Sequence, residues 1–136
     1  MMLKLFKVFV AGFLATNLHQ AALHGLHLAG LVPRMAWNMA PTEPLGVPEF
    51  ISLSFWAGIW ALALWWPSRA FKGARFWAWW IIAGAVGPSV VALLVVFPLK
   101  GAAFAGGWDP MLWGGAFLLN GIWGLGCAAL LRALRA

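Results

Sequence analysis

Residues 5–28 read LFKVFVAGFLATNLHQAALHGLHL, an apolar run whose second half carries several polar side chains. The run is long enough to cross the hydrocarbon core of a bilayer, which is about 30 Å thick and takes about 20 helical residues. At about 100° per residue, five polar side chains share an arc of roughly 100° on this helix, with His19 at its edge. These five, here called the polar stripe, are Thr16, Asn17, Gln20, His24 and His27. Because polar groups are costly in hydrocarbon, the stripe is expected to face a protein interior, a cavity or a partner.

The composition of the whole chain is typical of integral membrane proteins. Of its 136 residues, 64% are hydrophobic and only 9% are charged, whereas soluble domains are about 45–50% apolar and about 25% charged. Three further apolar runs, at about 48–66, 76–98 and 110–134, also have the length of a membrane span. We therefore expect an all-α fold, an integral membrane four-helix bundle that forms a single transmembrane domain over residues 1–136.

The basic residues predict how this bundle is oriented. Two of them, Arg34 and Lys100, lie beside one end of the predicted spans. The other seven lie beside the opposite end: Lys4, Lys7, Arg69, Lys72, Arg75, Arg132 and Arg135. Since cytoplasmic segments carry the excess of Lys and Arg, both termini are predicted to be cytoplasmic and the loop 30–47 external. The net charge of +6 then reflects topology and lipid headgroups, so the expected partner is the lipid bilayer and not nucleic acid.

Two short sequence matches suggest a parallel duplication of a helical hairpin. GIWAL at 58–62 matches GIWGL at 121–125, and AG at 11–12 matches AG at 83–84. A duplication would relate the first two helices to the last two by a pseudo-two-fold axis along the membrane normal. The alternative is a chance match between helices rich in Gly and Trp.

The candidate binding site combines the polar stripe with residues from other segments. Glu49 begins the second span, where the helix dipole favours a carboxylate, and it could also pair with an imidazole of the stripe. Asn120, inside the fourth span, needs a hydrogen-bond partner and either joins two helices or faces a cavity. The loop 30–47 could fold back over the stripe or be a plain connector. The candidate ligand-binding residues are Thr16, Asn17, Gln20, His24, His27, Trp37, Glu49, Trp56 and Asn120.

A metal site is an alternative use of the two histidines in the stripe. His24 and His27 lie three residues apart, a spacing that can direct both imidazoles toward one metal ion or haem edge. Met35 and Met39 in the external loop would add soft ligands that suit Cu(I). The opposing interpretation is that the imidazoles bond to neighbouring helices or to lipid headgroups. The metal candidates are therefore these four residues, and no metal or other cofactor is assigned.

Three functions fit these features, and none of them is enzymatic, because the chain has no Ser-His-Asp set, phosphate loop or paired intramembrane carboxylates. The leading hypothesis is an externally open polar pocket that binds a small hydrophobic or amphipathic ligand, or an accessory subunit that docks onto a larger membrane complex. The second is a small homodimeric transporter or channel. The third is a haem- or copper-binding redox accessory protein.

Several segments resemble small four-span inner-membrane proteins of proteobacteria. They are AGFLAT at 11–16 with the following His19-Gln20, PLGVP at 44–48, and FWAGIW at 55–60. The resemblance covers mainly the first half of the chain. It implies a multi-pass protein of the bacterial inner (plasma) membrane and implies no chemistry.

Overall fold

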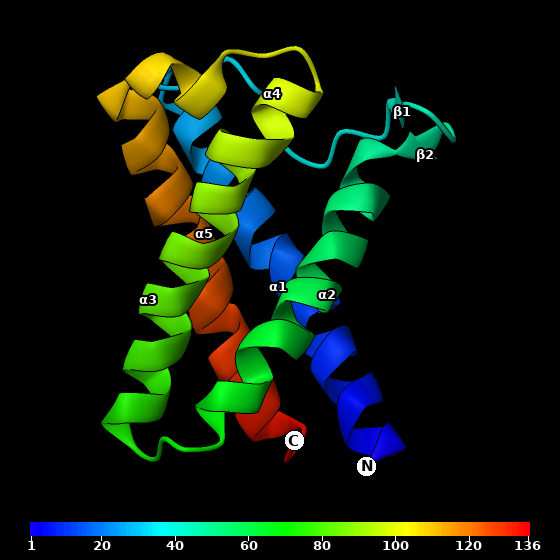
Figure 1. The fold of residues 1–136 in the computed structure, drawn as a ribbon, viewed down its shortest axis with the longest axis vertical. Coiled ribbons are helices and arrows are strands. Elements are labelled where there is room, and N and C mark those ends of the chain that lie inside the picture. Colours follow the sequence, from blue (N-terminus) through cyan, green and yellow to red (C-terminus); the bar gives the residue numbers. More distant parts are fainter.

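Four long helical spans, here called crossings, run side by side in the computed structural model of the protein (Figure 1). The structure describes all of residues 1–136. Three of them are single helices, α1 (Met2–Leu28), α2 (Glu49–Ser68) and α5 (Pro110–Ala133). By length and composition, all four crossings could span a membrane. The prediction of an all-α, four-span bundle in a multi-pass membrane protein is therefore confirmed, with helix ends within a few residues of the predicted ones.

The remaining crossing combines three helical segments. It begins as α3 (Ala74–Val91), changes to the π-helical segment η1 (Ala92–Val96) and ends as α4 (Phe97–Leu99). Pro88 lies inside α3 and has no backbone N–H to donate to the preceding turn. The helix passes this proline and takes up π geometry one turn later. Such π segments are rare and frequently lie at functional sites.

Both chain ends lie at the same end of the bundle, here called the terminal end (Figure 1). There, Lys7 Nζ donates a hydrogen bond to the carbonyl oxygen of Leu134 at 3.0 Å. The opposite end, here called the loop end, carries the two longer loops. One loop holds the antiparallel strands β1 (Pro41–Thr42) and β2 (Val47–Pro48), and the other holds the 3₁₀ segment η2 (Phe104–Trp108).

The four crossings form two helical hairpins, and in each hairpin small residues let the two helices pack closely together. In the α1–α2 hairpin, a Cβ atom on Gly12 would lie 2.5 Å from both the carbonyl oxygen of Ala57 and the Cβ of Ala61. In the α3–α5 hairpin, a Cβ atom on Gly84 would lie 3.0 Å from the Cα of Gly124 and 3.3 Å from the carbonyl oxygen of Asn120. The helix backbones can approach this closely only because the side chains at the contact between the two helices are small.

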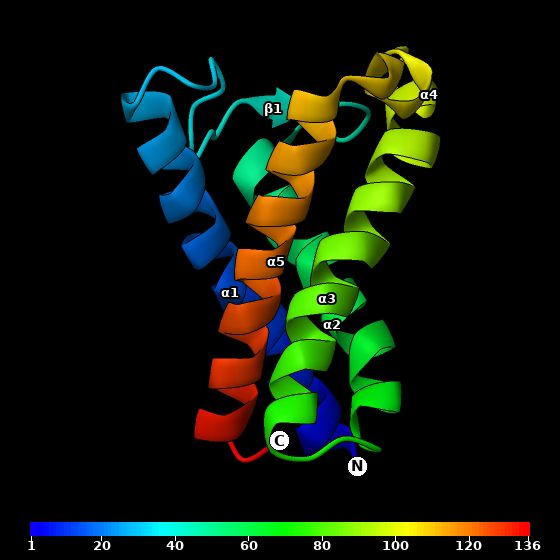
Figure 2. The same cartoon turned by 90° about the vertical axis from the view of Figure 1, so that its left-hand side faces the viewer.

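The two hairpins meet along two seams that differ in closeness. Along the first seam α1 packs closely on α5, whereas along the second α2 and α3 touch little (Figures 1 and 2). Trp123 Nε1 donates to the carbonyl oxygen of Gly12 at 3.0 Å and so joins α1 to α5. No comparable side-chain bond joins the loop-end halves of α2 and α3. The bundle is therefore closed on one side and open on the other.

The packed core occupies the half of the bundle next to the terminal end. Its twelve buried residues come from all four crossings and are Val8, Ala11, Ala15, Ala61, Leu64, Trp65, Phe76, Trp80, Trp123, Cys127, Ala128 and Leu131. Trp80 and Trp123 meet edge to face, with ring centres 6.5 Å apart. The loop-end half has no such core, because α2 and α3 diverge there.

Candidate functional site

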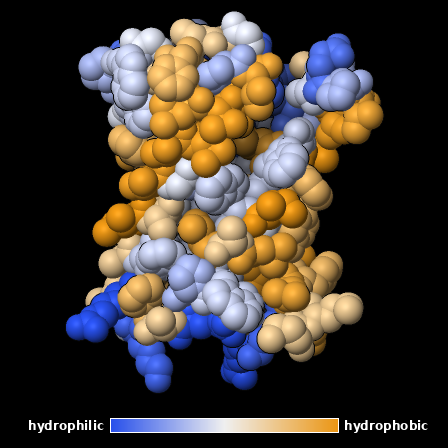
Figure 3. Space-filling model, in the orientation of Figure 1, coloured by the Kyte–Doolittle hydropathy of each residue, from blue (hydrophilic) through white to orange (hydrophobic).

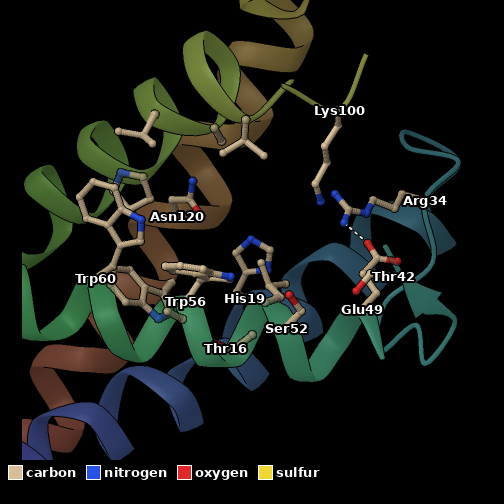
Figure 4. A pocket seen from close by; sticks show the side chains of 17 residues that line it. Thr16, His19, Arg34, Thr42, Glu49, Ser52, Trp56, Trp60, Lys100 and Asn120 are labelled. Carbon is tan, nitrogen blue, oxygen red and sulfur yellow. Dashed lines mark hydrogen bonds and ion pairs between the residues drawn. The ribbon is translucent and has the colours of Figure 1, made fainter. Parts of the chain in front are cut away.

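A cavity of about 260 Å³ occupies the loop-end half of the bundle, where α2 and α3 diverge (Figure 4). Residues from all four crossings and from both loops surround it. They are Thr16, His19, Arg34, Thr42, Glu49, Ser52, Leu53, Trp56, Ala57, Trp60, Pro88, Val91, Ala92, Val96, Lys100, Asn120 and Trp123.

The inner part of the cavity combines aromatic walls with a few polar groups whose positions are fixed. Trp56, Trp60 and Trp123 supply large apolar surfaces. Asn120 Nδ2 donates to Ser89 Oγ at 2.8 Å, so the amide both joins α5 to α3 and borders the cavity. The two roles considered for this asparagine are thus both present. Thr16 Oγ1 donates to the carbonyl oxygen one turn earlier in its own helix, at 3.2 Å.

The rim of the cavity is cationic. Arg34 and Lys100 approach the same end of the cavity from the two loops (Figure 4). Arg34 forms an ion pair with Glu49, and this is the single ion pair of the structure. Lys100 therefore has no carboxylate partner. Two cations and one anion give the rim a net charge of about +1.

Four of the nine predicted site residues line this cavity: Thr16, Glu49, Trp56 and Asn120. Asn17, Gln20, His24, His27 and Trp37 do not. The polar stripe is therefore divided between two faces of α1. Glu49 pairs with an arginine, so the acid–imidazole pair considered from the sequence is not formed.

The rest of the stripe holds the loop between α1 and α2. The backbone N–H of Trp37 donates to Gln20 Oε1 at 2.8 Å, and its indole Nε1 donates to Asn17 Oδ1 at 3.2 Å. The ring of His24 lies 6.0 Å from the ring of the same tryptophan. His27 Nδ1 is 3.1 Å from the carbonyl oxygen of Val32, also in this loop. The loop thus folds back onto α1, and these polar side chains are the surface to which it binds.

The candidate metal ligands lie on this loop-binding side. His24 and His27 contact the loop as described, and the side chains of Met35 and Met39 are more than half exposed. The chain contains no group of three or more His, Cys, Asp or Glu side chains arranged to hold a metal ion.

Five other residues that line the cavity were not among those predicted from the sequence: His19, Arg34, Trp60, Lys100 and Trp123. His19 lies three residues after Thr16, so the two share the face of α1 that points to the cavity. That spacing was the available sequence signal. Arg34 and Lys100 come from different loops, and nothing in the sequence indicates that they converge.

Replacing Gln20 with leucine is expected to loosen the loop between α1 and α2. The substitution removes the acceptor of the Trp37 N–H, and a net hydrogen bond contributes about 1 kcal/mol. Hydrogen exchange at the backbone amide of Trp37 should become about fivefold faster, because the loop opens locally more often. Ala21→Leu, on the exposed face of the same helical turn, is the matched control. Equal exchange in the two variants would contradict the assigned role of Gln20.

No protein-family model, curated protein or solved structure matches this chain.

Proposed function

We propose that this protein binds a single-chain amphiphile with an anionic head, without converting it chemically. The bound molecule would lie in the cavity between α2 and α3, with its chain against the tryptophans and its head at the rim. In this proposal the protein belongs to a bacterial inner membrane, both termini are cytoplasmic, and the ligand comes from the outer leaflet. The observation that carries the proposal is a cavity that combines aromatic walls with a cationic rim.

The size of the cavity supports a slender ligand. Pockets for small molecules usually measure about 300–1,000 Å³, so a cavity of about 260 Å³ is slightly smaller than this range. It suits one acyl chain, or part of one, better than a two-chain lipid. A few polar groups among apolar walls are the usual composition of such pockets.

The open seam supports lateral entry from the membrane. Trp56 lines the cavity and is still 58% exposed on the side of α2. Figure 3 looks onto this seam and shows pale residues between the orange, apolar surfaces of the two helices. An acyl chain could therefore enter between the helices without first leaving hydrocarbon.

The packed core supports binding in preference to permeation. The twelve core residues fill the terminal-end half of the bundle below the cavity. A permeation path would have to continue through this half, between side chains such as Trp80 and Leu131 that are at most 1% exposed. The cavity is thus open toward one side of the membrane.

We also propose that the bundle arose by duplication of a helical hairpin. Matching glycines at 12 and 84 make matching contacts. Gly12 lies against the carbonyl oxygen of Ala57 and against Ala61, while Gly84 lies against the carbonyl oxygen of Asn120 and against Gly124. Ala57 and Asn120 directly precede the matching GIW segments, and Ala61 and Gly124 are corresponding letters within them.

The cavity would then lie between the two repeats. Trp60 and Trp123 are corresponding residues of the two GIW segments, and both line it. Under a pseudo-two-fold axis the closed α1–α5 seam corresponds to the open α2–α3 seam. The cavity occupies the one of the two seams that is not closed by packing.

Photolabelling tests the proposal directly. The full chain in lipid nanodiscs is illuminated with a long-chain fatty acid that carries a diazirine in its chain. We expect labelled peptides from residues 52–60 and 88–96. Ala92→Phe, which fills the cavity, should reduce this labelling about tenfold or more, since an overlapping ring leaves no room for the chain. Ala78→Phe, at an exposed position of the same crossing, is the matched control.

The head of the ligand is tested with a second probe. Lys100→Gln should weaken the fatty-acid labelling about fivefold, because it removes the cation that has no carboxylate partner. The same variant should leave labelling by a neutral monoacylglycerol with the same chain unchanged. Arg75→Gln removes a cation at the terminal end that lines neither this cavity nor any other described here, and it serves as the control. Labelling spread over all lipid-facing helices and insensitive to Ala92→Phe would contradict the proposed function.

A further inference from the structure

A second cavity, of about 250 Å³, lies at the terminal end of the bundle. The ends of all four crossings and the α2–α3 loop meet around it. Its lining residues are Lys4, Trp65, Ser68, Arg69, Phe71, Lys72, Phe76, Arg132 and Ala136. It is separated from the first cavity by the packed core and takes no part in the function proposed above.

Positively charged side chains are concentrated around this cavity. Lys4, Arg69, Lys72 and Arg132 border it, and no acidic side chain does. The three acidic residues of the chain, Glu43, Glu49 and Asp109, all belong to the loop end. None of the four cations forms an ion pair, since the one ion pair of the structure joins Arg34 to Glu49. Figure 3 shows strongly hydrophilic surface gathered at this end of the molecule.

Aromatic rings hold the two arginines in place. The guanidinium carbon of Arg69 lies 3.6 Å from the ring centre of Trp66 and 5.2 Å from that of Trp65. The guanidinium carbon of Arg132 lies 4.1 Å from the ring centre of Phe76. Cation–π contacts of this kind position a guanidinium without using its N–H groups in hydrogen bonds to an acceptor atom. Of these donors, only Arg69 Nε is occupied, at 3.2 Å from the carbonyl oxygen of Trp66.

Such an arrangement matches the chemistry of a phosphate group. Guanidinium donors in one plane bind phosphate oxygens in a bidentate manner, and lysines add charge without a fixed geometry. Basic pockets between the ends of transmembrane helices bind the headgroups of anionic lipids. Trp65 and Phe71, which also line the cavity, provide apolar surface where the glycerol and upper acyl chains of such a lipid would lie.

We propose that the terminal-end cavity is a binding site for a phosphate group, carried by the headgroup of an anionic membrane phospholipid. Arg69 and Arg132 contact the phosphate, while Lys4 and Lys72 supply the surrounding charge. The site sits where helix ends meet the membrane surface, so a lipid reaches it without leaving its leaflet. Occupancy of the site would tie the ends of all four crossings together.

The test compares lipids bound to the intact protein by native mass spectrometry. Protein in mild detergent is titrated with phosphatidylglycerol or with phosphatidylcholine of the same chains. We expect phosphatidylglycerol to be retained preferentially, and we expect Arg132→Gln to weaken its binding about tenfold. Arg75→Gln and Arg135→Gln remove arginines at the same end that do not line the cavity, and they should change the binding little.

Two further arms make the outcome decisive. Lys72→Gln alters a side chain with no hydrogen bond or ion pair, so a loss of phosphatidylglycerol in this variant is not a folding defect and supports the site. Inorganic phosphate added in excess separates the sources: displacement of the lipid assigns the site to the phosphate group alone, and retention assigns it to the lipid headgroup. Equal losses in Arg75→Gln and Arg132→Gln, or equal retention of both lipids, would overturn the proposal.

Discussion

Gly124→Ala is expected to destabilise the folded protein strongly. A Cβ atom at this position would overlap the carbonyl oxygen of Trp80 on the neighbouring helix and would also approach the Cα of Ile81. The overlap is with backbone and not with a flexible side chain, so it can be relieved only by separating α3 from α5. Overpacking of a core costs about 1–3 kcal/mol and occasionally more. We expect at least about 3 kcal/mol here, a large part of the usual stability of about 5–15 kcal/mol.

The same substitution elsewhere in the helix provides the control. No atom of another residue lies within 4 Å of a Cβ placed on Gly114, in the loop-end half of α5. Because alanine is the better helix former by about 1 kcal/mol, Gly114→Ala should leave the protein equally stable or slightly more stable. Unfolding midpoints in a titration with sodium dodecyl sulfate would compare the two variants. Similar midpoints for Gly124→Ala and Gly114→Ala would show that the backbones of α3 and α5 do not pack as closely as described.

Trp123→Ala is expected to be nearly as damaging, by a different mechanism. The side chain is 3% exposed, packs edge to face on Trp80, and bonds to the carbonyl oxygen of Gly12. Truncating a buried tryptophan to alanine typically costs about 3–5 kcal/mol, because a void replaces its contacts. In hydrocarbon these contacts, and not the hydrophobic effect, hold helices together. The variant should therefore loosen α1 from α5.

A second tryptophan in the same helical hairpin tests whether position or residue type matters. Trp108, in η2 at the loop end, is 63% exposed. Trp108→Ala should lower the unfolding midpoint far less than Trp123→Ala, since exposed side chains lose few contacts. Fluorescence-detected size-exclusion chromatography after heating would rank the two variants. An equal loss of the monodisperse peak would argue against the α1–α5 seam as the main tie between the hairpins.

The fold was predictable because its determinants are local in the sequence. Each span is an apolar run of sufficient length, and hydrocarbon leaves helices as the only conformation that satisfies the backbone of such a run. The first residues of α2 and α5 were predictable from Pro48 and Pro110, because proline suits the start of a helix. The π geometry of η1 was not predictable in this way, because it depends on how the chain past Pro88 packs against its neighbours.

The site was predictable only in part, because it depends on how α1 is rotated. A stripe of polar residues indicates that one side of a helix does not face lipid, but it does not show which neighbouring element lies against that side. In the structure Thr16 and His19 face the cavity, while Asn17 and Gln20 bind Trp37. The rim could not be deduced at all, since Arg34 and Lys100 converge only when two loops far apart in sequence come together.

The unequal seams also bear on motion. The α1–α5 seam, with its indole bond to Gly12, has the position of a hinge between the α1–α2 and α3–α5 hairpins. Moving the loop-end halves of α2 and α3 further apart breaks few contacts, because these two helices touch little. Separating α1 from α5 would break many. The two hairpins can thus rotate about the α1–α5 seam to admit ligands of different width, while the helix packing within each hairpin stays unchanged.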